Sequence, residues 1–215
     1  ISEILAGNSE EQVAYRSNKR YVGRLRKGFP SNQQTHKKVS NLNISKEGTY
    51  VISGGLGGLG LELAKWLAKQ GASSLVLLSR SGPKNTEQQD ILSELSNIGV
   101  VVKTPKVDIS DYSMLASTLE NLEDSFPPIK GIIHAAGTLE DGFLVQQSHE
   151  NFRKVFAPKV DGALNLHRFS KKLNLDFFIM YSSASTTVGS PGQTNYSAAN
   201  ACLDALAHYL VAQGL

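Results

Sequence analysis

The chain has 215 residues, of which 40% are hydrophobic and 19% are charged, a balance typical of a globular protein with one ordinary domain and some additional chain. No run approaches the ~20 apolar residues of a membrane helix, and no signal peptide is recognised at the start, so we expect neither a membrane partner nor secretion. The net charge of +3 is uneven, because nine Lys and Arg face four acidic residues before position 49.

The basic first part is either a nucleic-acid-binding arm or a solvated linker. Its charges are scattered among Ser, Asn and Gln without a recognition-helix pattern, which favours the linker and excludes a nucleic-acid partner. The single cysteine, Cys202, cannot form an internal disulfide, which indicates a reducing cytoplasm. It lies within the apolar helix that follows Asn195, and we expect it to fill the core rather than to act as a nucleophile.

Two short, partly alternating runs open the chain, at 12–16 and 21–25, with residues 17–20 between them. This pattern predicts a β-hairpin. The polar stretch at 27–48 contains Pro30, Asn32 and paired glutamines, and it is interpreted as a linker.

From Thr49 onward strand and helix patterns alternate. Nearly continuous apolar runs, which are typical of parallel strands buried on both faces, occupy residues 49–53, 74–79, 100–107, 129–135 and 175–182. Helical spacing is seen between these runs, for example at Leu59, Leu63, Trp66 and Leu67, and Asp111 is placed to cap the helix after the third strand. The order predicts a doubly wound, Rossmann-type parallel sheet of the α/β class.

A glycine-rich turn follows the first predicted strand. Side chains there would keep a pyrophosphate away from the unpaired N–H groups of the next helix, so glycine favours dinucleotide binding over a turn without ligand. The candidate cofactor-binding residues of this segment are Ser53, Gly54, Gly55, Gly57, Gly58, Leu59 and Gly60.

The end of the second strand indicates which dinucleotide binds. An NAD-binding protein usually places an acidic residue there for the ribose hydroxyls, whereas this chain has Ser79, Arg80 and Ser81. Arg80 suits the 2′-phosphate of NADPH by its charge and its fork of donors, and the alternative is an arginine that only extends from a strand end into solvent. NADPH is therefore the predicted cofactor.

The third and fourth strands end at the same edge of the sheet, where ligands of such folds bind. Asp108 and Ile109 lie at the first of these ends, and Asp108 would either reach the adenine or cap the following segment. At the second end we expect His134 to shape the floor under the cofactor rather than to act as an acid, and the candidate contacts Ala135, Ala136 and Gly137 follow it. The five histidines show no paired ligand spacing, so no metal is predicted.

Four polar residues form the candidate catalytic set. Ser183 follows the fifth strand, and Tyr196 and Asn200 stand one helical turn apart on one helix face. A free tyrosine has a pKa of about 10, so acid–base work near neutral pH needs a cation, and Lys159 is available.

From Thr49 to its end the chain resembles the catalytic subdomain of polyketide synthase ketoreductases, a branch of the short-chain dehydrogenases. The shared runs are Gly54–Gly60, Leu78–Gly82, His134–Gly137, Lys159–Gly162 and Ser190–Asn200. In ordinary short-chain dehydrogenases a lysine follows the tyrosine by four residues. Here Asn200 takes that place and Lys159 lies upstream, an exchange that marks these ketoreductases.

The resemblance implies roles for these residues. Tyr196 would donate the proton, Ser183 would hold the ketone oxygen, Lys159 would bind the nicotinamide ribose and stabilise the tyrosinate, and Asn200 would hold a relay water. The substrate would be a 3-ketoacyl thioester on the phosphopantetheine of an acyl carrier protein, within a multidomain synthase of polyketide biosynthesis. Two rivals remain, a catalytically silent scaffold domain and a free-standing carbonyl reductase.

The resemblance also implies a stereochemical class. Family members that form the D-configured 3-hydroxyl (B-type) carry Leu-x-Asp after the fourth strand, and here Leu139 and Asp141 occupy that place. The opposite class has Trp eight residues before the tyrosine, where this chain has Val188. We therefore expect B-type reduction, with Leu139, Asp141 and Gln193 steering the substrate.

The domain organisation expected from the family has three parts. Residues 1–26 would end a preceding structural subdomain, residues 27–48 would link, and residues 49–215 would form the catalytic subdomain without its last strands and lid. A chain of this extent is expected to be poorly active by itself.

Overall fold

The computed structural model describes residues 13–24, 42–123 and 125–214, together with residues 5, 7 and 10. The chain divides into two compact units, Ile1–Ser40 and Asn41–Leu215. The division falls inside the segment interpreted as a linker, of which residues 27–41 lie outside the described part. Each unit is considered by itself.

The first unit contains the predicted hairpin, formed by the antiparallel strands β1 (Val13–Arg16) and β2 (Lys19–Val22). The second strand was predicted at 21–25, but it begins earlier, at Lys19, because only two residues make the turn. Ser17 and Asn18 have φ values of 48° and 60°, the left-handed backbone that two-residue hairpin turns of type I′ require.

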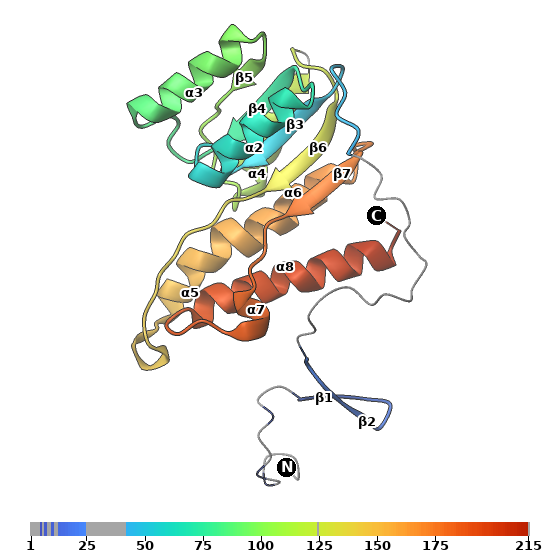
Figure 1. The fold of residues 1–215 in the computed structure, drawn as a ribbon, viewed down its shortest axis with the longest axis vertical. Coiled ribbons are helices and arrows are strands. Elements are labelled where there is room, and N and C mark those ends of the chain that lie inside the picture. The colour runs from blue at the N-terminus through green and yellow to red at the C-terminus, as the bar shows by residue number, and fades with distance from the viewer. Residues whose placement is uncertain are drawn as a thin grey trace. The chain divides into compact units, whose positions relative to one another are not determined.

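The second unit is built on a five-stranded parallel sheet in the order β5-β4-β3-β6-β7, which confirms the doubly wound prediction (Figure 1). The strands are β3 (Thr49–Ser53), β4 (Ser74–Leu78), β5 (Val101–Lys103), β6 (Ile129–His134) and β7 (Phe177–Met180). The predicted third strand at 100–107 is shorter, and beyond Lys103 only a single bridge between Lys106 and Ser79 continues the pairing.

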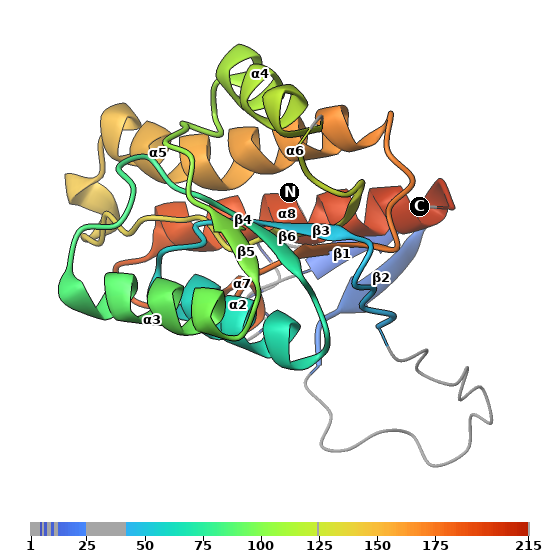
Figure 2. The ribbon, with the colours of Figure 1, turned by 90° about the horizontal axis from the view of Figure 1, so that it is seen from above.

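Helices cover both faces of the sheet (Figure 2). One face carries α2 (Gly58–Lys69) and α3 (Thr86–Asn97), and the other carries α4 (Tyr112–Glu123) and α6 (Gly162–Ser170). The remaining elements are η1 (Leu144–Gln146), α5 (His149–Phe156), the π-helical turn η2 (Ala157–Asp161), α7 (Ser185–Val188) and α8 (Thr194–Ala212), and α8 packs against α5 and η2.

The central strand β3 explains the two cores, because its successive side chains point to opposite faces. Tyr50 and Ile52 pack with α2 and α3, whereas Val51 packs with α4 and α6, and all three are fully buried. The interpretation as strands covered on both sides is confirmed for β3 and β4, which are buried throughout, whereas β5 is partly exposed.

Local details of the helices agree in part with the sequence patterns. Asp111 caps α4 through a hydrogen bond from the Met114 N–H to its carboxylate (3.0 Å), as predicted. The expectation that Cys202 fills the core is wrong, because α8 buries the face that carries Leu203 and leaves Cys202 exposed. Within the described ranges, no helix has both the length and the apolar character needed to span a bilayer.

Candidate active site

A cavity of about 640 Å³ opens at the carboxyl edge of the sheet, where β3, β4 and β6 end. This is the edge at which open α/β sheets bind ligands. Ten of the predicted cofactor residues line it, namely Gly54, Gly57, Ser79, Arg80, Ser81, Asp108, Ile109, Ala135, Ala136 and Gly137. The cavity is also lined by residues that were not among the predicted cofactor contacts, namely Leu56, Leu78, Gly82, Lys84, Gln88, Val107 and Pro158.

The glycine turn gives the cavity a wall of bare backbone. Gly54 has φ +68°, and a Cβ there would lie 2.8 Å from the backbone of Ala136, so only glycine fits. Gly57 stands at the N-cap of α2 and provides no capping side chain, which leaves the first N–H groups of the helix free for an anion. These features fit the pyrophosphate of a dinucleotide.

The other predicted glycine-turn residues lie outside the cavity lining. A Cβ on Gly55 would lie 2.6 Å from the Leu77 Cβ, so Gly55 serves the close packing of the turn on β4. Ser53 is completely buried, and Leu59 is 50% exposed on the outer side of α2.

Positive side chains flank the part of the cavity beside β4. Arg80 and Lys84 both line it, and no acidic residue stands in Ser79–Ser81. Gln88 joins this loop to the glycine turn, because its side-chain amide donates to the Leu56 carbonyl (2.8 Å) and its oxygen accepts from the Lys84 N–H (2.6 Å). The arrangement suits a phosphate bound between cations.

Asp108 caps the segment that follows it, one of the two arrangements that the sequence left open, and its contact with the adenine stays a prediction. Its carboxylate accepts hydrogen bonds from the Ser110 N–H (2.9 Å) and hydroxyl (2.7 Å), and it also lines the cavity. The Ser110 hydrogen bonds hold the pKa of this carboxyl below its usual value, and the positive charge of Arg80 acts in the same direction.

Lys159 and Tyr196 lie close together, although they are far apart in the sequence and neither of them lines the cavity. The Lys159 Nζ donates to the Tyr181 carbonyl (3.0 Å) and lies 5.3 Å from the centre of the Tyr196 ring. Lys159 is only 4% exposed, and its burial lowers the pKa of the ammonium.

Asn200 completes the face of α8 next to Tyr196. Its amide donates to the Tyr196 carbonyl (2.8 Å), whereas its Oδ1 is buried and finds no hydrogen-bond partner among the described residues. A buried, unpaired oxygen of this kind is costly unless water or a ligand reaches it.

Ser183 lies between the end of β7 and the start of α7. Its hydroxyl accepts from the Ser185 N–H (3.2 Å), and the neighbouring Ser182 hydroxyl donates to the Asn200 carbonyl (3.4 Å). The segment that carries Ser183 is therefore joined to the helix that carries Asn200 and Tyr196.

The segment after β6 is held to the start of α8 by contacts that the sequence analysis did not identify. Asp141 accepts from the Gln193 amide (3.1 and 3.3 Å), and the Gly142 N–H donates to the Gly192 carbonyl (2.8 Å). Buried Asn195 donates to the Glu140 carbonyl (2.8 Å). Leu139 stands 54% exposed at the start of this segment.

Gln147 strengthens the same connection. Its amide donates to the carbonyls of Glu140 (3.0 Å) and Gly142 (3.2 Å), and its oxygen accepts from Asn195 (3.0 Å). Asn195 in turn accepts from the Tyr196 N–H (2.7 Å). The position of the loop is thus fixed relative to Tyr196.

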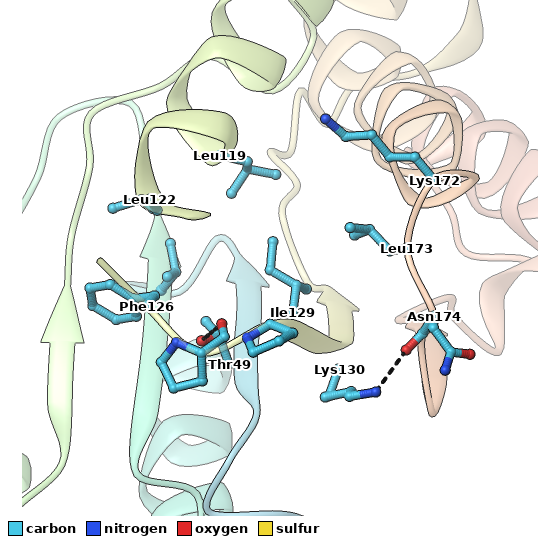
Figure 3. Close-up of a pocket in the computed structure, with 12 residues that line it drawn as sticks. Thr49, Leu119, Leu122, Phe126, Ile129, Lys130, Lys172, Leu173 and Asn174 are labelled. Carbon is cyan, nitrogen blue, oxygen red and sulfur yellow. Dashed lines mark hydrogen bonds between the residues drawn. The ribbon is translucent and has the colours of Figure 1, made fainter. Parts of the chain in front are cut away.

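A second cavity, of about 390 Å³, lies at the opposite edge, where β3 and β6 begin. Its lining is mostly apolar, with Leu119, Leu122, Phe126 and Ile129 facing one another (Figure 3). Lys130 closes one side by donating to the Asn174 carbonyl (3.5 Å). None of the predicted site residues lines it. No cluster of potential metal ligands occurs among residues that the structure describes.

Comparison with known proteins places these features in context. The model of the KR domain family matches residues 48–215. Highly reducing polyketide synthase 40 of Fusarium mangiferae is 41% identical over 169 residues, which cover 79% of this chain and 7% of that protein. Highly reducing polyketide synthase Preu1 of Preussia isomera is 41% identical over 183 residues, which cover 82% of this chain and 8% of that protein. The chain therefore spans less than a tenth of the length of these relatives.

Solved structures agree with these matches. A ketoreductase domain from the bacillaene assembly line has 33% identity and a TM-score of 0.84, with 99% of this chain and 49% of that chain covered. The first ketoreductase of the tylosin polyketide synthase has 34% identity and a TM-score of 0.82, covering 100% of this chain and 45% of that chain. The chain thus spans less than half the length of these solved chains.

Proposed function

Because the chain belongs to the KR family, the ketoreductase domains of polyketide synthases, we propose that it reduces the 3-keto group of an acyl thioester with NADPH. The observation that carries this proposal is the position of Lys159, whose ammonium lies 5.3 Å from the Tyr196 ring centre. Gly137 lines the cavity suited to a dinucleotide, and a Cβ on Gly137 would lie 3.7 Å from the same ammonium.

The choice of NADPH over NADH rests on the cations beside β4. The 2′-phosphate is the group that distinguishes the two, and Arg80 and Lys84 line the cavity where no acidic residue of the strand end repels it. The unpaired N–H groups at the start of α2 would hold the pyrophosphate.

The chemistry requires a hydride and a proton. NADPH, when bound, supplies the hydride to the carbonyl carbon. Tyr196 gives its phenolic proton to the carbonyl oxygen, so the ketone becomes a secondary alcohol and the resulting tyrosinate regains a proton from water. Lys159 stabilises that tyrosinate by its charge, and Ser183 donates a hydrogen bond to the carbonyl oxygen.

Asn200 is assigned to the water that restores the proton. Its buried Oδ1 has no partner among the described residues and lies on the same helix face as Tyr196. A bound water would satisfy this oxygen and connect the tyrosinate with solvent.

The stereochemistry is assigned to the loop after β6. Leu139 is exposed at its start, and the bond between Gln193 and Asp141 joins the loop to α8. We propose that these three residues admit the substrate arm from one side, so that the 3-hydroxyl is D-configured.

The partners follow from the family. The substrate is carried by an acyl carrier protein through its phosphopantetheine, and neighbouring synthase domains share the cytoplasmic assembly. Residues 1–26 end a structural subdomain and residues 27–48 link it to the catalytic subdomain at 49–215.

The test is NADPH oxidation by the complete gene product with a 3-ketoacyl thioester on its carrier protein. Wild type is compared with Tyr196→Phe and with Tyr209→Phe, a control on the same helix at a position that is 58% exposed. The configuration of the product is assigned by chiral chromatography.

We expect turnover in the wild type and the control, loss of turnover in Tyr196→Phe, and a D-configured product. Equal turnover in Tyr196→Phe would remove this residue from its role. A wild type that shows neither turnover nor an NADPH-dependent rise in melting temperature would favour the silent scaffold.

A further inference from the structure

His134 is the last residue of β6, and it is completely buried. Its Nδ1 lies 2.6 Å from the Ser53 hydroxyl, and its Nε2 lies 2.8 Å from the Lys159 carbonyl oxygen. One imidazole therefore joins the end of β3, the end of β6 and the π-helical turn η2.

The two contacts determine which nitrogen of the ring carries the hydrogen. A carbonyl oxygen only accepts hydrogen bonds, so Nε2 must carry the hydrogen. Nδ1 of the neutral ring is then an acceptor, and the Ser53 hydroxyl donates to it. Burial agrees with this state, because it lowers the pKa of His134 to about 4.

We propose that His134 is a positioning residue for the reduction: through the Lys159 carbonyl it fixes the lysine that serves Tyr196. The inference depends on the proposed function, because it takes the role of Lys159 from there. It adds a residue that does not line the cofactor cavity and that acts through Lys159.

The π-helical turn helps His134 to fix the position of Lys159. Lys159 is held at both ends, with its carbonyl bonded to His134 and its Nζ bonded to the Tyr181 carbonyl. A wide π turn is often found at functional sites. With Pro158 beside it, the turn leaves Lys159 little backbone freedom.

Close packing prevents the ring and the turn from moving apart sideways. A Cβ on Gly162, just after the turn, would lie 2.6 Å from the Ile109 Cδ1 and 3.5 Å from the His134 Cε1. Glycine at this position brings α6 directly against Ile109, with the His134 ring at van der Waals distance, so the hydrogen bond to Lys159 is formed in a closely packed site.

The other end of the connection reaches the cofactor cavity. Ser53 directly precedes Gly54, whose positive φ begins the glycine turn. His134 thus sets the position of the lysine relative to the same turn that is proposed to hold the pyrophosphate. Alignment of the hydride and proton sources requires this relative position to be constant.

The test separates the two bonds with a matched pair of variants in the complete gene product. In His134→Gln the amide nitrogen takes the place of Nε2 and still donates to the Lys159 carbonyl. In His134→Asn the amide oxygen takes the place of Nδ1 and still accepts from Ser53, but the bond to Lys159 is lost. Ser53→Ala removes only the Ser53 bond.

Two readouts are measured on all proteins. The first is the pH dependence of ketone reduction at saturating NADPH. The second is amide hydrogen exchange of residues 157–163 by mass spectrometry, with β4 as the internal control, and this readout does not depend on activity.

We expect turnover of His134→Asn to fall about 10- to 100-fold, as for a displacement of about 1 Å at a reacting group. The alkaline limb of its pH–rate profile should shift to higher pH. The shift arises because an ammonium displaced toward solvent keeps its proton to higher pH. Exchange at 157–163 should accelerate in His134→Asn and remain near wild type in His134→Gln and Ser53→Ala.

The proposal is overturned if His134→Asn keeps the wild-type pH profile and exchange rates, or if His134→Gln is impaired equally in both. If the wild type reduces no ketone, the proposed function fails, but the exchange pattern still tests whether His134 holds η2 in place. An active wild type with no difference among the variants refutes only the positioning role.

Discussion

Acidification should weaken the fold through His134. Burial lowers the pKa of this histidine from 6.5 in the unfolded chain to about 4 in the folded one. Between these values the unfolded state binds the extra proton, so stability rises with pH. The contribution is fully present above pH 6.5, and it is lost as the pH falls toward 4.

The size of the effect follows from the difference between the pKa values of His134 in the unfolded and the folded chain. One pKa unit corresponds to 1.36 kcal/mol, so a shift from 6.5 to about 4 makes a total of about 3 kcal/mol. Linkage places about 2 kcal/mol of this loss between pH 7 and pH 5. That amount is a substantial part of the 5–15 kcal/mol by which domains are usually stable.

The assay is urea unfolding at several pH values between 4.5 and 7.5, with the wild type compared with His134→Gln. The variant lacks the titrating ring but keeps a donor toward the Lys159 carbonyl, while every other titrating group is common to both proteins. The free energy of unfolding should fall more steeply with acid in the wild type. Parallel curves would show that His134 does not titrate as reasoned.

Five further substitutions test other parts of the structure. Tyr196→Phe should lower turnover by about 10²- to 10⁴-fold while leaving NADPH affinity nearly unchanged, as measured by turnover and by cofactor fluorescence titration. Arg80→Ala should weaken NADPH binding about 10- to 100-fold and NADH binding little; an equal loss for both would contradict the 2′-phosphate assignment. Gly131→Ala should destabilise the fold by about 1–3 kcal/mol in urea unfolding, because its Cβ would lie 2.7 Å from the Tyr50 ring, whereas Gly58→Ala, with no neighbour within 4 Å, should stabilise it by about 0.5–1 kcal/mol. Gln147→Ala should yield a mixture of product configurations by chiral chromatography with NADPH affinity retained, because the loop at 140–142 loses two of its hydrogen bonds.

The sheet was predictable because local signals and burial agree in it. A strand covered on both faces is apolar along most of its length. β3 is such a strand, because Thr49–Ser53 is entirely buried and its three central residues are apolar. Where the cover is incomplete the pattern misleads. Val101 in the predicted third strand is 54% exposed, and regular pairing there ends at Lys103.

Helix faces were harder to assign from spacing alone. In α2 the predicted repeat is Leu59, Leu63, Trp66 and Leu67, and of these Leu67 is buried and Leu63 is partly buried. Leu59 and Trp66 are exposed, and Leu61 and Ala64 are buried instead. The close approach of Gly60 to the glycine turn determines this choice, and such an approach is a tertiary property. Cys202 was misplaced for the same reason, because α8 is apolar on more than one side.

The site shows the same division between local and tertiary information. The glycine turn and Arg80 are local motifs, and both line the cavity. Lys84 and Gln88 lacked such a signal, because their importance depends on how the loop after β4 folds back toward the glycine turn. Asn195 and Gln147 act through contacts 48 residues apart, which no spacing rule reveals.

His134 illustrates why a correct residue type can be given an incomplete role. Its place before three small residues indicates the floor of a cofactor site, and the sequence supports nothing more specific. The polar partners that define its tautomer are 81 residues upstream, at Ser53, and 25 residues downstream, at Lys159. A buried polar group must find such partners, so its presence at a strand end signals a connection whose far side only the fold identifies. Here that far side is the backbone of Lys159, so we expect the stability of the sheet edge and the position of this lysine to depend on the same imidazole.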